Sequence, residues 1–292
     1  MKAPAKINLT LDIISKRADG YHEISSEMRA VRLFDEVTVE LFARRGESTA
    51  APEINVRASA PGVPEGKGNL AYKAAESILA MYPCRYGRID IELKKMIPAA
   101  AGLGGGSADA AAVLLYLAKD AAPEAVLSEI AAWGAGLGMD VPFCVYACAA
   151  ANPELGYKGA GAALATGAGE KLTILSDIKK APVVLVKPPV EVPTKEVYDL
   201  YDRWEGPGSL LESANALEAA CAAAWPVVAE TLTGLKEICA AEGACEAKVQ
   251  LSGSGPTVFA YFNDAQKSEA ERVCSRAKSF FKDAFVCHTE TL

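Results

Sequence analysis

The sequence predicts an α+β fold divided into two domains. Its 292 residues, 51% of them hydrophobic, lie near the size at which a single core splits into two. Segments with strand-like and helix-like patterns alternate in both halves of the chain. Several connections between them are short enough for hairpins, which favours an α+β arrangement over a doubly wound parallel sheet.

The first predicted strand lies close to the N-terminus. Apolar and polar residues alternate over 7–12, which is the period of a half-buried strand. Lys6, Asn8 and Thr10 are therefore expected to project from one face. Two side chains with groups suited to catalysis or binding, those of Lys6 and Asn8, then point the same way. Asp19 and Gly20 form a turn signal further along.

Further strands and two helices complete the first half. The same alternation predicts strands over 37–41 and 89–94. Apolar residues then recur at helical spacing over 111–118. A second helix is predicted over 123–133, where Pro123 suits a first turn, and glycines break the pattern after it.

The boundary between the domains is predicted within 147–169. This segment is rich in glycine and alanine and poor in bulky apolar residues, so it is a poor core element and a reasonable junction. We therefore divide the chain into 1–160 and 161–292.

The second half has the elements of its own domain. The run VVLV predicts a buried strand over 183–186. Helical stretches are predicted near 209–224 and 264–279. The segment 248–262, KVQLSGSGPTVFAYF, is typical of a strand, a Gly-Ser-Gly turn and a second strand.

Composition excludes several classes of function. The net charge of −7 and the lack of a basic block argue against a nucleic-acid partner. No apolar run approaches the roughly 18 residues of a membrane span, so we expect a soluble, cytoplasmic protein without a membrane partner. Eight cysteines without a C-x-x-C pair, and two histidines, indicate reduced, mostly buried thiols rather than a zinc framework.

The most informative segment is IPAAAGLGGGSADAAAVLLYLA, over 97–118. A strand, a glycine-rich turn and a helix in this order aim free amides and the positive end of the helix dipole at an anion. We expect a phosphate site, with Ser107 capping the helix and Asp109 in its first turn as a capping residue. The alternative is a merely flexible connection.

This phosphate site is of none of the commonest kinds. The P-loop string G-x-x-x-x-G-K-[ST] is absent, and the dinucleotide pattern G-x-G-x-x-G fails because Ser107 stands in place of its last glycine. The strings H-R-D and D-F-G are also absent, which excludes a protein kinase.

The loop PAAAGLGGGSADAA resembles the central motif of the GHMP small-molecule kinases, and LSGSGPTVFAYF is similar to the family's third motif. The resemblance implies an N-terminal domain like ribosomal protein S5 domain 2 and a ferredoxin-like C-terminal domain. The opening APAKINLTLDIISKRADGYHEI, with LGMDVPF and VEVPTKEVYDLYD, resembles the branch that phosphorylates a hydroxyl of a diphosphocytidyl polyol for isoprenoid synthesis. By the family's spacing, 147–161 resembles an insertion.

The resemblance also implies the roles of individual residues. Asp140 would be the catalytic base, and Lys6 would lower the pKa of the acceptor hydroxyl or stabilise the transferring group. Taken alone, Asp140 is typical of a turn residue and Lys6 of a solvated charge. The predicted ATP contacts are Pro98, Ala99, Ala100, Ala101, Gly102, Leu103, Gly104, Gly105, Gly106, Ser107 and Ala108, with Asn69 and Lys95 in the adenine pocket.

The acceptor is expected to contact residues from both halves. These are Asn8, Tyr21, His22, Thr194, Tyr198, Gly253 and Ser254, with the two tyrosines and the histidine around the base. His288 has no motif around it and is interpreted as structural.

ATP chemistry implies Mg²⁺, whose ligands the sequence does not identify beyond Ser107 as a candidate. Two alternatives remain: another GHMP kinase acting on a sugar, homoserine or mevalonate, or a catalytically silent nucleotide-binding homologue.

Overall fold

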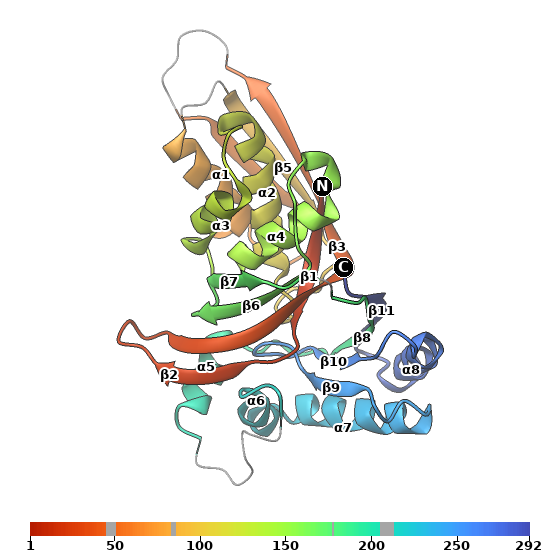
Figure 1. Cartoon of the computed structure of the whole chain (residues 1–292). Helices are drawn as coiled ribbons and strands as arrows, with labels where there is room; N and C mark the ends of the chain where they lie inside the picture. Colours follow the sequence, from red (N-terminus) through yellow and green to blue (C-terminus); the bar gives the residue numbers. More distant parts are fainter. Residues whose placement is uncertain (45–50, 83–85, 177, 205–212) are drawn as a thin grey trace.

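The computed structural model describes residues 1–44, 51–82, 86–176, 178–204 and 213–292. These residues form two lobes, each with its own sheet; the C-terminus lies near the boundary between them, and the N-terminus lies within the first lobe (Figure 1). Strands and helices mix within each lobe, so the predicted α+β class is confirmed.

The first lobe is a sheet with helices packed on one side. Its strands are β1 (Lys2–Asn8), β2 (Asp12–Lys16), β3 (His22–Ala43), β4 (Glu53–Ala58), β5 (Tyr86–Lys94), β6 (Ala162–Gly167) and β7 (Lys171–Ile174). The long strand β3 pairs with β1, β2, β5 and β6. Its helical segments are η1 (Gly66–Gly68), α1 (Leu70–Met81), α2 (Gly105–Ala121), α3 (Leu127–Ala135), α4 (Val141–Ala151) and η2 (Pro153–Leu155).

Helix α2 lies at the centre of the first lobe. It packs against α1, α4 and β1, and its residues are buried almost without a break from Ala108 to Ala118. A helix buried on all sides has no polar face, and alanine lets neighbouring elements approach closely. The alanine-rich composition of this segment therefore reflects its central position.

The second lobe has the order of elements β-α-β-β-α-β. Its strands are β8 (Pro182–Lys187), β9 (Lys248–Leu251), β10 (Val258–Tyr261) and β11 (Phe285–Glu290), arranged β11-β8-β10-β9 and antiparallel throughout. Its helices are α5 (Thr194–Tyr201), α6 (Glu218–Ala224), α7 (Pro226–Ala241) and α8 (Lys267–Phe280). This arrangement agrees with the expected ferredoxin-like domain.

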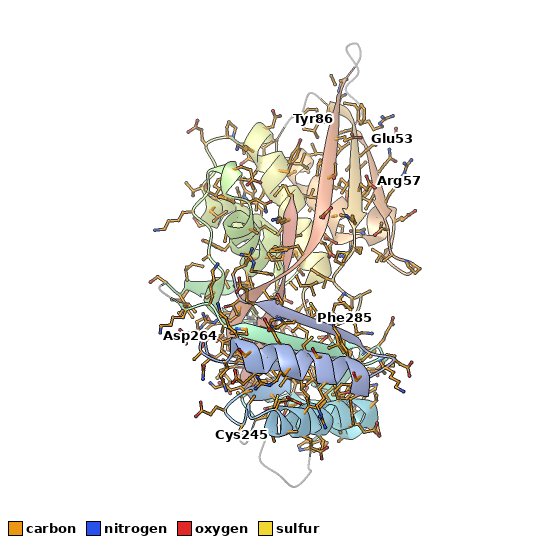
Figure 2. The ribbon with its side chains drawn as sticks, turned by 90° about the vertical axis from the view of Figure 1, so that its right-hand side faces the viewer. Glu53, Arg57, Tyr86, Cys245, Asp264 and Phe285 are labelled. Atoms are coloured by element: carbon orange, nitrogen blue, oxygen red, sulfur yellow. The ribbon has the colours of Figure 1, made fainter. Side chains whose placement is uncertain are left out.

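An apolar boundary joins the two lobes. Val184 and Val186 of β8 face the helices of the second lobe. Val183 and Leu185 pack against β1, β3 and the glycine-rich segment 97–106, called the glycine loop below. Strand β8 is thus buried on both faces, which explains why its sequence is continuously apolar. Strand β11, which carries Phe285, lies along this boundary (Figure 2).

The structure corrects two predicted boundaries. The second helix begins at Leu127, and Pro123 lies in the turn before it rather than in its first turn. The segment 147–169 is no open linker, because it contains the end of α4, η2 and β6. Strands β6 and β7 pair with the first sheet, so sheet membership favours a division between Ile174 and Pro182 over the predicted division at 160–161.

Three other expectations can be compared with the described residues. Within these residues the cysteines are free thiols, and five of the seven are buried. Residues 209–212 of one predicted helical stretch lie outside the described residues, and α6 occupies the end of that stretch. Within the parts of the chain that the structure describes, none of the helices combines the length and hydrophobicity of a membrane span.

Candidate active site

A cavity of about 1080 Å³ lies between the lobes, next to the glycine loop. Its lining brings together β1, the β2–β3 hairpin, the start of α2, the residue before α4, helix α5 and the turn after β9. Every predicted site residue except Ala108 lines it. Ala108 is fully buried in the core of the first lobe and its N–H donates to Gly104 O, so it does not line the cavity.

The glycine loop has a backbone that few side chains allow. Ala100, Gly102 and Gly104 have φ angles of 48°, 72° and 70°, in the left-handed region. Helix α2 begins directly afterwards at Gly105, and its N-cap Gly104 supplies no capping side chain. Because the first amides of a helix have no intrahelical partners, they remain available to an anion.

Two predicted capping roles at this helix are wrong. Ser107 is not the N-cap, because the helix begins two residues earlier and Ser107 lies inside its first turn. Asp109 lies beyond the first turn and is 2% exposed, so it does not complement the helix dipole from solvent. The structure leaves the Ser107 side chain half-buried in the lining of the cavity.

The Gly-Ser-Gly turn at 253–255, called the second glycine turn below, packs directly on the glycine loop. A β-carbon on Gly102 would lie 2.6 Å from Ser252 O and 2.7 Å from Gly255 O. The Ser252 hydroxyl donates a hydrogen bond to Gly102 O, at 3.1 Å. The two glycine-rich segments, far apart in the sequence, therefore form one surface.

Lys6 and Asp140 form a charged pair beside the glycine loop. Lys6 Nζ lies 3.2 Å from Asp140 Oδ2 and donates to Asn8 Oδ1 at 2.8 Å. Asn8 Nδ2 donates to Ser26 Oγ, so both ends of the buried Asn8 amide are engaged. Lys6 is 5% exposed, which makes it a buried cation held by two oxygens rather than a solvated charge.

Backbone geometry brings this pair to the glycine-rich surface. A β-carbon on Gly104 would lie 2.9 Å from Lys6 Cγ, and one on Gly253 would lie 3.2 Å from Asn8 Oδ1. Asp140 immediately precedes α4 at its N-cap, and its side chain is 30% exposed. An aspartate beside an ammonium, with one side open to the cavity, can accept a proton from a bound hydroxyl.

A buried ionic cluster fixes the start of the loop. Lys95 Nζ contacts Asp35 Oδ2 and Asp109 Oδ2, and Asp35 Oδ1 accepts from the amides of Met96 and Ile97 at 2.6 and 2.8 Å. Burial lowers the pKa of Lys95, but the two carboxylates raise it by more, so the ammonium stays charged. Burial raises the pKa of Asp109 to about 7, against the opposing effect of Lys95.

The base-binding residues of the prediction meet at the β2–β3 hairpin and α5. The His22 ring stacks on Tyr198 with centroids 4.9 Å apart, and His22 Nε2 lies 2.7 Å from Asp202 Oδ1. Tyr21 is 53% exposed at the edge of the cavity. The structure thus places Tyr198 against His22 in the lining of the cavity.

Three further predicted residues have structural partners. Asn69 caps α1, accepting from Ala71 N at 2.8 Å and donating to Pro64 O at 2.7 Å. The hydroxyls of Thr194 and Ser254 lie 2.9 Å apart, which links α5 to the second glycine turn.

Sequence reasoning missed Asp35, Asp202 and Asn215. Asn215 Nδ2 donates to Leu251 O and Gly253 O, and so holds the second glycine turn. Asp35 and Asn215 lie in none of the motifs named above, whereas Asp202 is the last residue of the string VEVPTKEVYDLYD and could have been found there.

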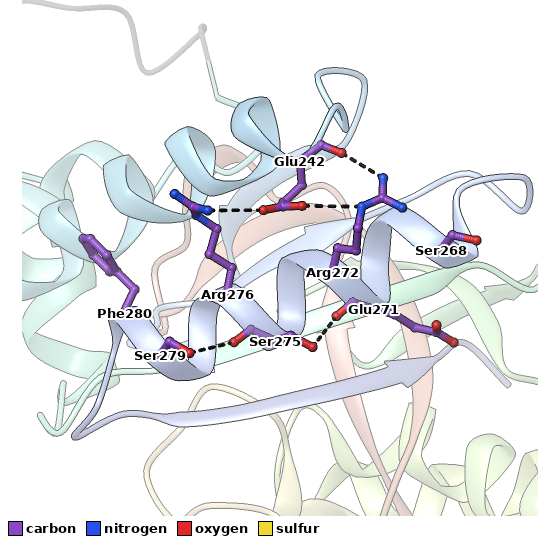
Figure 3. Close-up of a pocket in the computed structure, with 8 residues that line it drawn as sticks. All are labelled: Glu242, Ser268, Glu271, Arg272, Ser275, Arg276, Ser279 and Phe280. Carbon is purple, nitrogen blue, oxygen red and sulfur yellow. Dashed lines mark hydrogen bonds and ion pairs between the residues drawn. The ribbon is translucent and has the colours of Figure 1, made fainter.

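A second hollow, of about 920 Å³, lies on the outer surface of the second lobe (Figure 3). Arg272 and Arg276 line it, and both guanidinium groups pair with Glu242, at 3.4 and 3.5 Å. No predicted site residue lies there. The cavity between the lobes is therefore the candidate active site.

The fold and this cavity define a small-molecule kinase, and comparison with known proteins gives the family. The GHMP kinases N terminal domain matches residues 69–148 and the GHMP kinases C terminal domain matches 203–283. The chain belongs to the GHMP kinase family.

Two of its relatives carry the same name. A 4-diphosphocytidyl-2-C-methyl-D-erythritol kinase from Clostridium beijerinckii is 37% identical over 303 residues, covering 99% of each chain. One from Geobacter sulfurreducens is 37% identical over 302 residues, covering 97% of each.

Solved structures agree with the family. A structure of 4-(cytidine 5'-diphospho)-2C-methyl-D-erythritol kinase is 30% identical, with a TM-score of 0.72 and coverage of 100% of this chain and 99% of that chain. A homoserine kinase from Cytophaga hutchinsonii shares the fold at 18% identity and a TM-score of 0.68, covering 100% and 93%.

Proposed function

We propose that this chain transfers the γ-phosphoryl group of ATP to the C2 hydroxyl of 4-diphosphocytidyl-2-C-methyl-D-erythritol. The products are the 2-phosphate and ADP, in the non-mevalonate pathway to isoprenoid precursors. The single observation that carries the proposal is the Lys6–Asp140 pair, 3.2 Å apart in a cavity walled by the glycine loop. Full-length relatives with this activity in their names support the choice of acceptor.

In the proposed reaction, Asp140 takes the proton of the C2 hydroxyl. The hydroxyl oxygen forms a bond to the γ-phosphorus as the bond from that phosphorus to the bridging oxygen breaks, and ADP leaves. Lys6 holds the developing negative charge near the attacking oxygen, and Asn8 keeps the Lys6 ammonium in place through the 2.8 Å hydrogen bond. Because Lys6 is buried, its charge acts in a medium of low dielectric constant.

The glycine loop is proposed to bind the triphosphate. Amides at the start of α2, next to the N-cap Gly104, have no helical partners and carry the positive end of the helix dipole. Gly106 is exposed and has only Leu70 Cδ1 near its would-be β-carbon, at 3.8 Å, so a phosphate can approach the backbone there. Asn69 and Lys95, which also line the cavity, border the proposed adenine end.

At the other end of the cavity, Tyr21, His22 and Tyr198 are proposed to bind the cytidine base. Aromatic faces suit a flat heterocycle, and the half-exposed Tyr21 ring is free to stack. Thr194, Ser254 and Gly253 lie between this end and Lys6, where the diphosphate and polyol of the acceptor would pass.

The residues present fit a magnesium ion that is carried mainly by the nucleotide. Among the described residues, no group of three His, Cys, Asp or Glu side chains could hold a metal by itself. Ser107 supplies one hydroxyl oxygen to the cavity lining, which suits an ion that keeps most of its water and phosphate ligands. When bound, Mg²⁺ would neutralise charge on the phosphates.

The place and partners of the enzyme remain predictions. We propose that it acts in the cytoplasm on two small molecules, ATP and a diphosphocytidyl polyol, without nucleic acid or membrane.

Phosphorus NMR of the products tests the function directly. The purified chain is incubated with ATP, Mg²⁺ and 4-diphosphocytidyl-2-C-methyl-D-erythritol, and parallel samples contain mevalonate, homoserine or galactose. We expect a new phosphomonoester signal and ADP with the first acceptor alone. Turnover confined to another acceptor would assign a different GHMP kinase activity, and ATP binding without any turnover would indicate a silent homologue.

A further inference from the structure

His22 uses one of its two ring nitrogens inside the protein. Nε2 lies 2.7 Å from Asp202 Oδ1, and the ring is fixed by stacking on Tyr198. Within the described residues, no hydrogen-bond partner of Nδ1 is found, although the side chain is only 6% exposed. Because His22 lines the cavity, Nδ1 is the nitrogen left for a ligand.

The partner carboxylate determines which nitrogen carries the proton. Asp202 also contacts Lys16 Nζ, and that hydrogen bond lowers the pKa of Asp202, with His22 adding to the effect. An ionised carboxylate only accepts hydrogen bonds, so Nε2 must be the donor. In a neutral imidazole, Nδ1 then presents a lone pair.

Lys16 contacts the second oxygen of the same carboxylate. Lys16 Nζ contacts Asp202 Oδ2, whereas His22 Nε2 contacts Asp202 Oδ1. In the neutral ring, Nδ1 is therefore the accepting nitrogen.

We propose that Asp202 is a positioning residue that fixes the His22 tautomer and so makes the cavity select a base with an amino group over one with a carbonyl group at the same place. This inference rests on the proposed function, in which the base of the acceptor lies against His22.

The two pyrimidines of the test differ at one edge of the ring. Cytosine presents its N4 amino group as a hydrogen-bond donor, whereas uracil has an accepting oxygen in that position. An accepting Nδ1 binds the amino group and faces the uracil oxygen lone pair to lone pair. Such a mismatch leaves two buried acceptors without a donor, and it disfavours the uridine form by roughly tenfold to a hundredfold.

The tautomer can be measured without any substrate. The chain has two histidines, His22 and His288, so a ¹⁵N–¹H correlation spectrum of the side chains contains two imidazoles, and His288 is the exposed reference. We expect the Nε2–H tautomer for His22 at mildly alkaline pH. In Asp202→Asn, whose amide can also donate, we expect that single tautomer to be lost. A His22 ring with Nδ1–H in the parent chain would overturn the inference.

The selection is measured as the ratio of kcat/KM for the diphosphocytidyl acceptor to that for its diphosphouridyl analogue. We expect Asp202→Asn to reduce this ratio by about tenfold or more. The matched control is Glu196→Gln, which removes one negative charge from an exposed position of α5, the helix that Asp202 follows. This variant should keep both the ratio and the tautomer. An unchanged ratio in Asp202→Asn would overturn the proposal.

The outcomes separate this inference from the function on which it rests. Equal turnover of both acceptors by the parent chain overturns the base selection and leaves the kinase function intact. Turnover of neither acceptor overturns the proposed function and the selection with it, and the imidazole spectrum still reports on the Asp202–His22 pair.

Discussion

Replacement of Gly102 by alanine tests whether the two glycine-rich segments form one rigid surface. An alanine at φ +72° lies in the left-handed region, which costs about 1–2 kcal/mol. Its β-carbon would also lie 2.6 and 2.7 Å from two backbone oxygens that cannot rotate away. Relief of such overlap shifts the backbone and costs about 1–3 kcal/mol more.

Gly243→Ala is the matched control for this variant. Gly243 has a φ of +76°, but no atom lies within 4 Å of its would-be β-carbon, so it carries the backbone cost alone. At about 2–4 °C for each kcal/mol in a protein of this size, Gly102→Ala should unfold roughly 2–12 °C below Gly243→Ala. The assay is differential scanning calorimetry of both variants and the parent chain.

Kinetics of the same two variants complete the test. We expect the KM for ATP to rise in Gly102→Ala, because the strained loop moves away from the second glycine turn, and to stay unchanged in Gly243→Ala. Equal unfolding temperatures for the two variants would refute the reasoning, since the overlap with Ser252 O and Gly255 O would then cost nothing.

Three further predictions concern the cavity and its supports. Lys6→Ala and Asp140→Ala should each lower kcat by roughly a hundredfold or more, measured by ADP release, and near-normal turnover in either would remove its proposed role. Asn69→Ala should lose about 1 kcal/mol of unfolding free energy in urea because α1 loses its N-cap, and an unchanged midpoint would contradict this. The pKa of Asp109 in the folded state is about 7, above its ordinary value of 3.8, which applies in the unfolded chain. The protonated carboxyl therefore stabilises the folded state fully below about pH 4, and this contribution is lost as the pH rises toward 7. Asp109→Asn should flatten this part of the stability profile, and an unaltered slope in urea titrations across that range would count against the assignment.

The strands and the loop were predictable because their signals are local. Alternation over 89–94 indicates one buried face, and the run of glycines indicates a backbone with left-handed residues followed by a helix. The strand predicted over 7–12 is misplaced, because β1 ends at Asn8 and β2 begins at Asp12, and β1 is buried continuously from Ala3 to Asn8. The continuous apolar strand over 183–186 was also identified, and the structure explains it by burial on both faces.

The missed features depend on partners that are distant in the sequence. Strand β6 is built from small residues, which are weak strand formers, and it fits because Phe143 and Met28 fill the space beside it. Asp35 acts through the amides of Met96 and Ile97, about sixty residues away, and no pattern around Asp35 indicates this contact. The contact of Asp202 likewise depends on a distant segment, the hairpin that carries His22.

The apolar boundary between the lobes has a consequence for the catalytic cycle. Ile7, Val31, Leu185 and Phe259 are fully buried there, and Gln250 donates to the carbonyls of Asn8 and Leu9 across it. If one lobe rotated away from the other, these apolar side chains would become exposed to water and the two carbonyls would lose their hydrogen-bond donor. Both effects disfavour opening by a large rigid-body motion. This boundary therefore favours a cleft that keeps much the same width through a catalytic cycle, so that reactants bind in a space that folding has already formed.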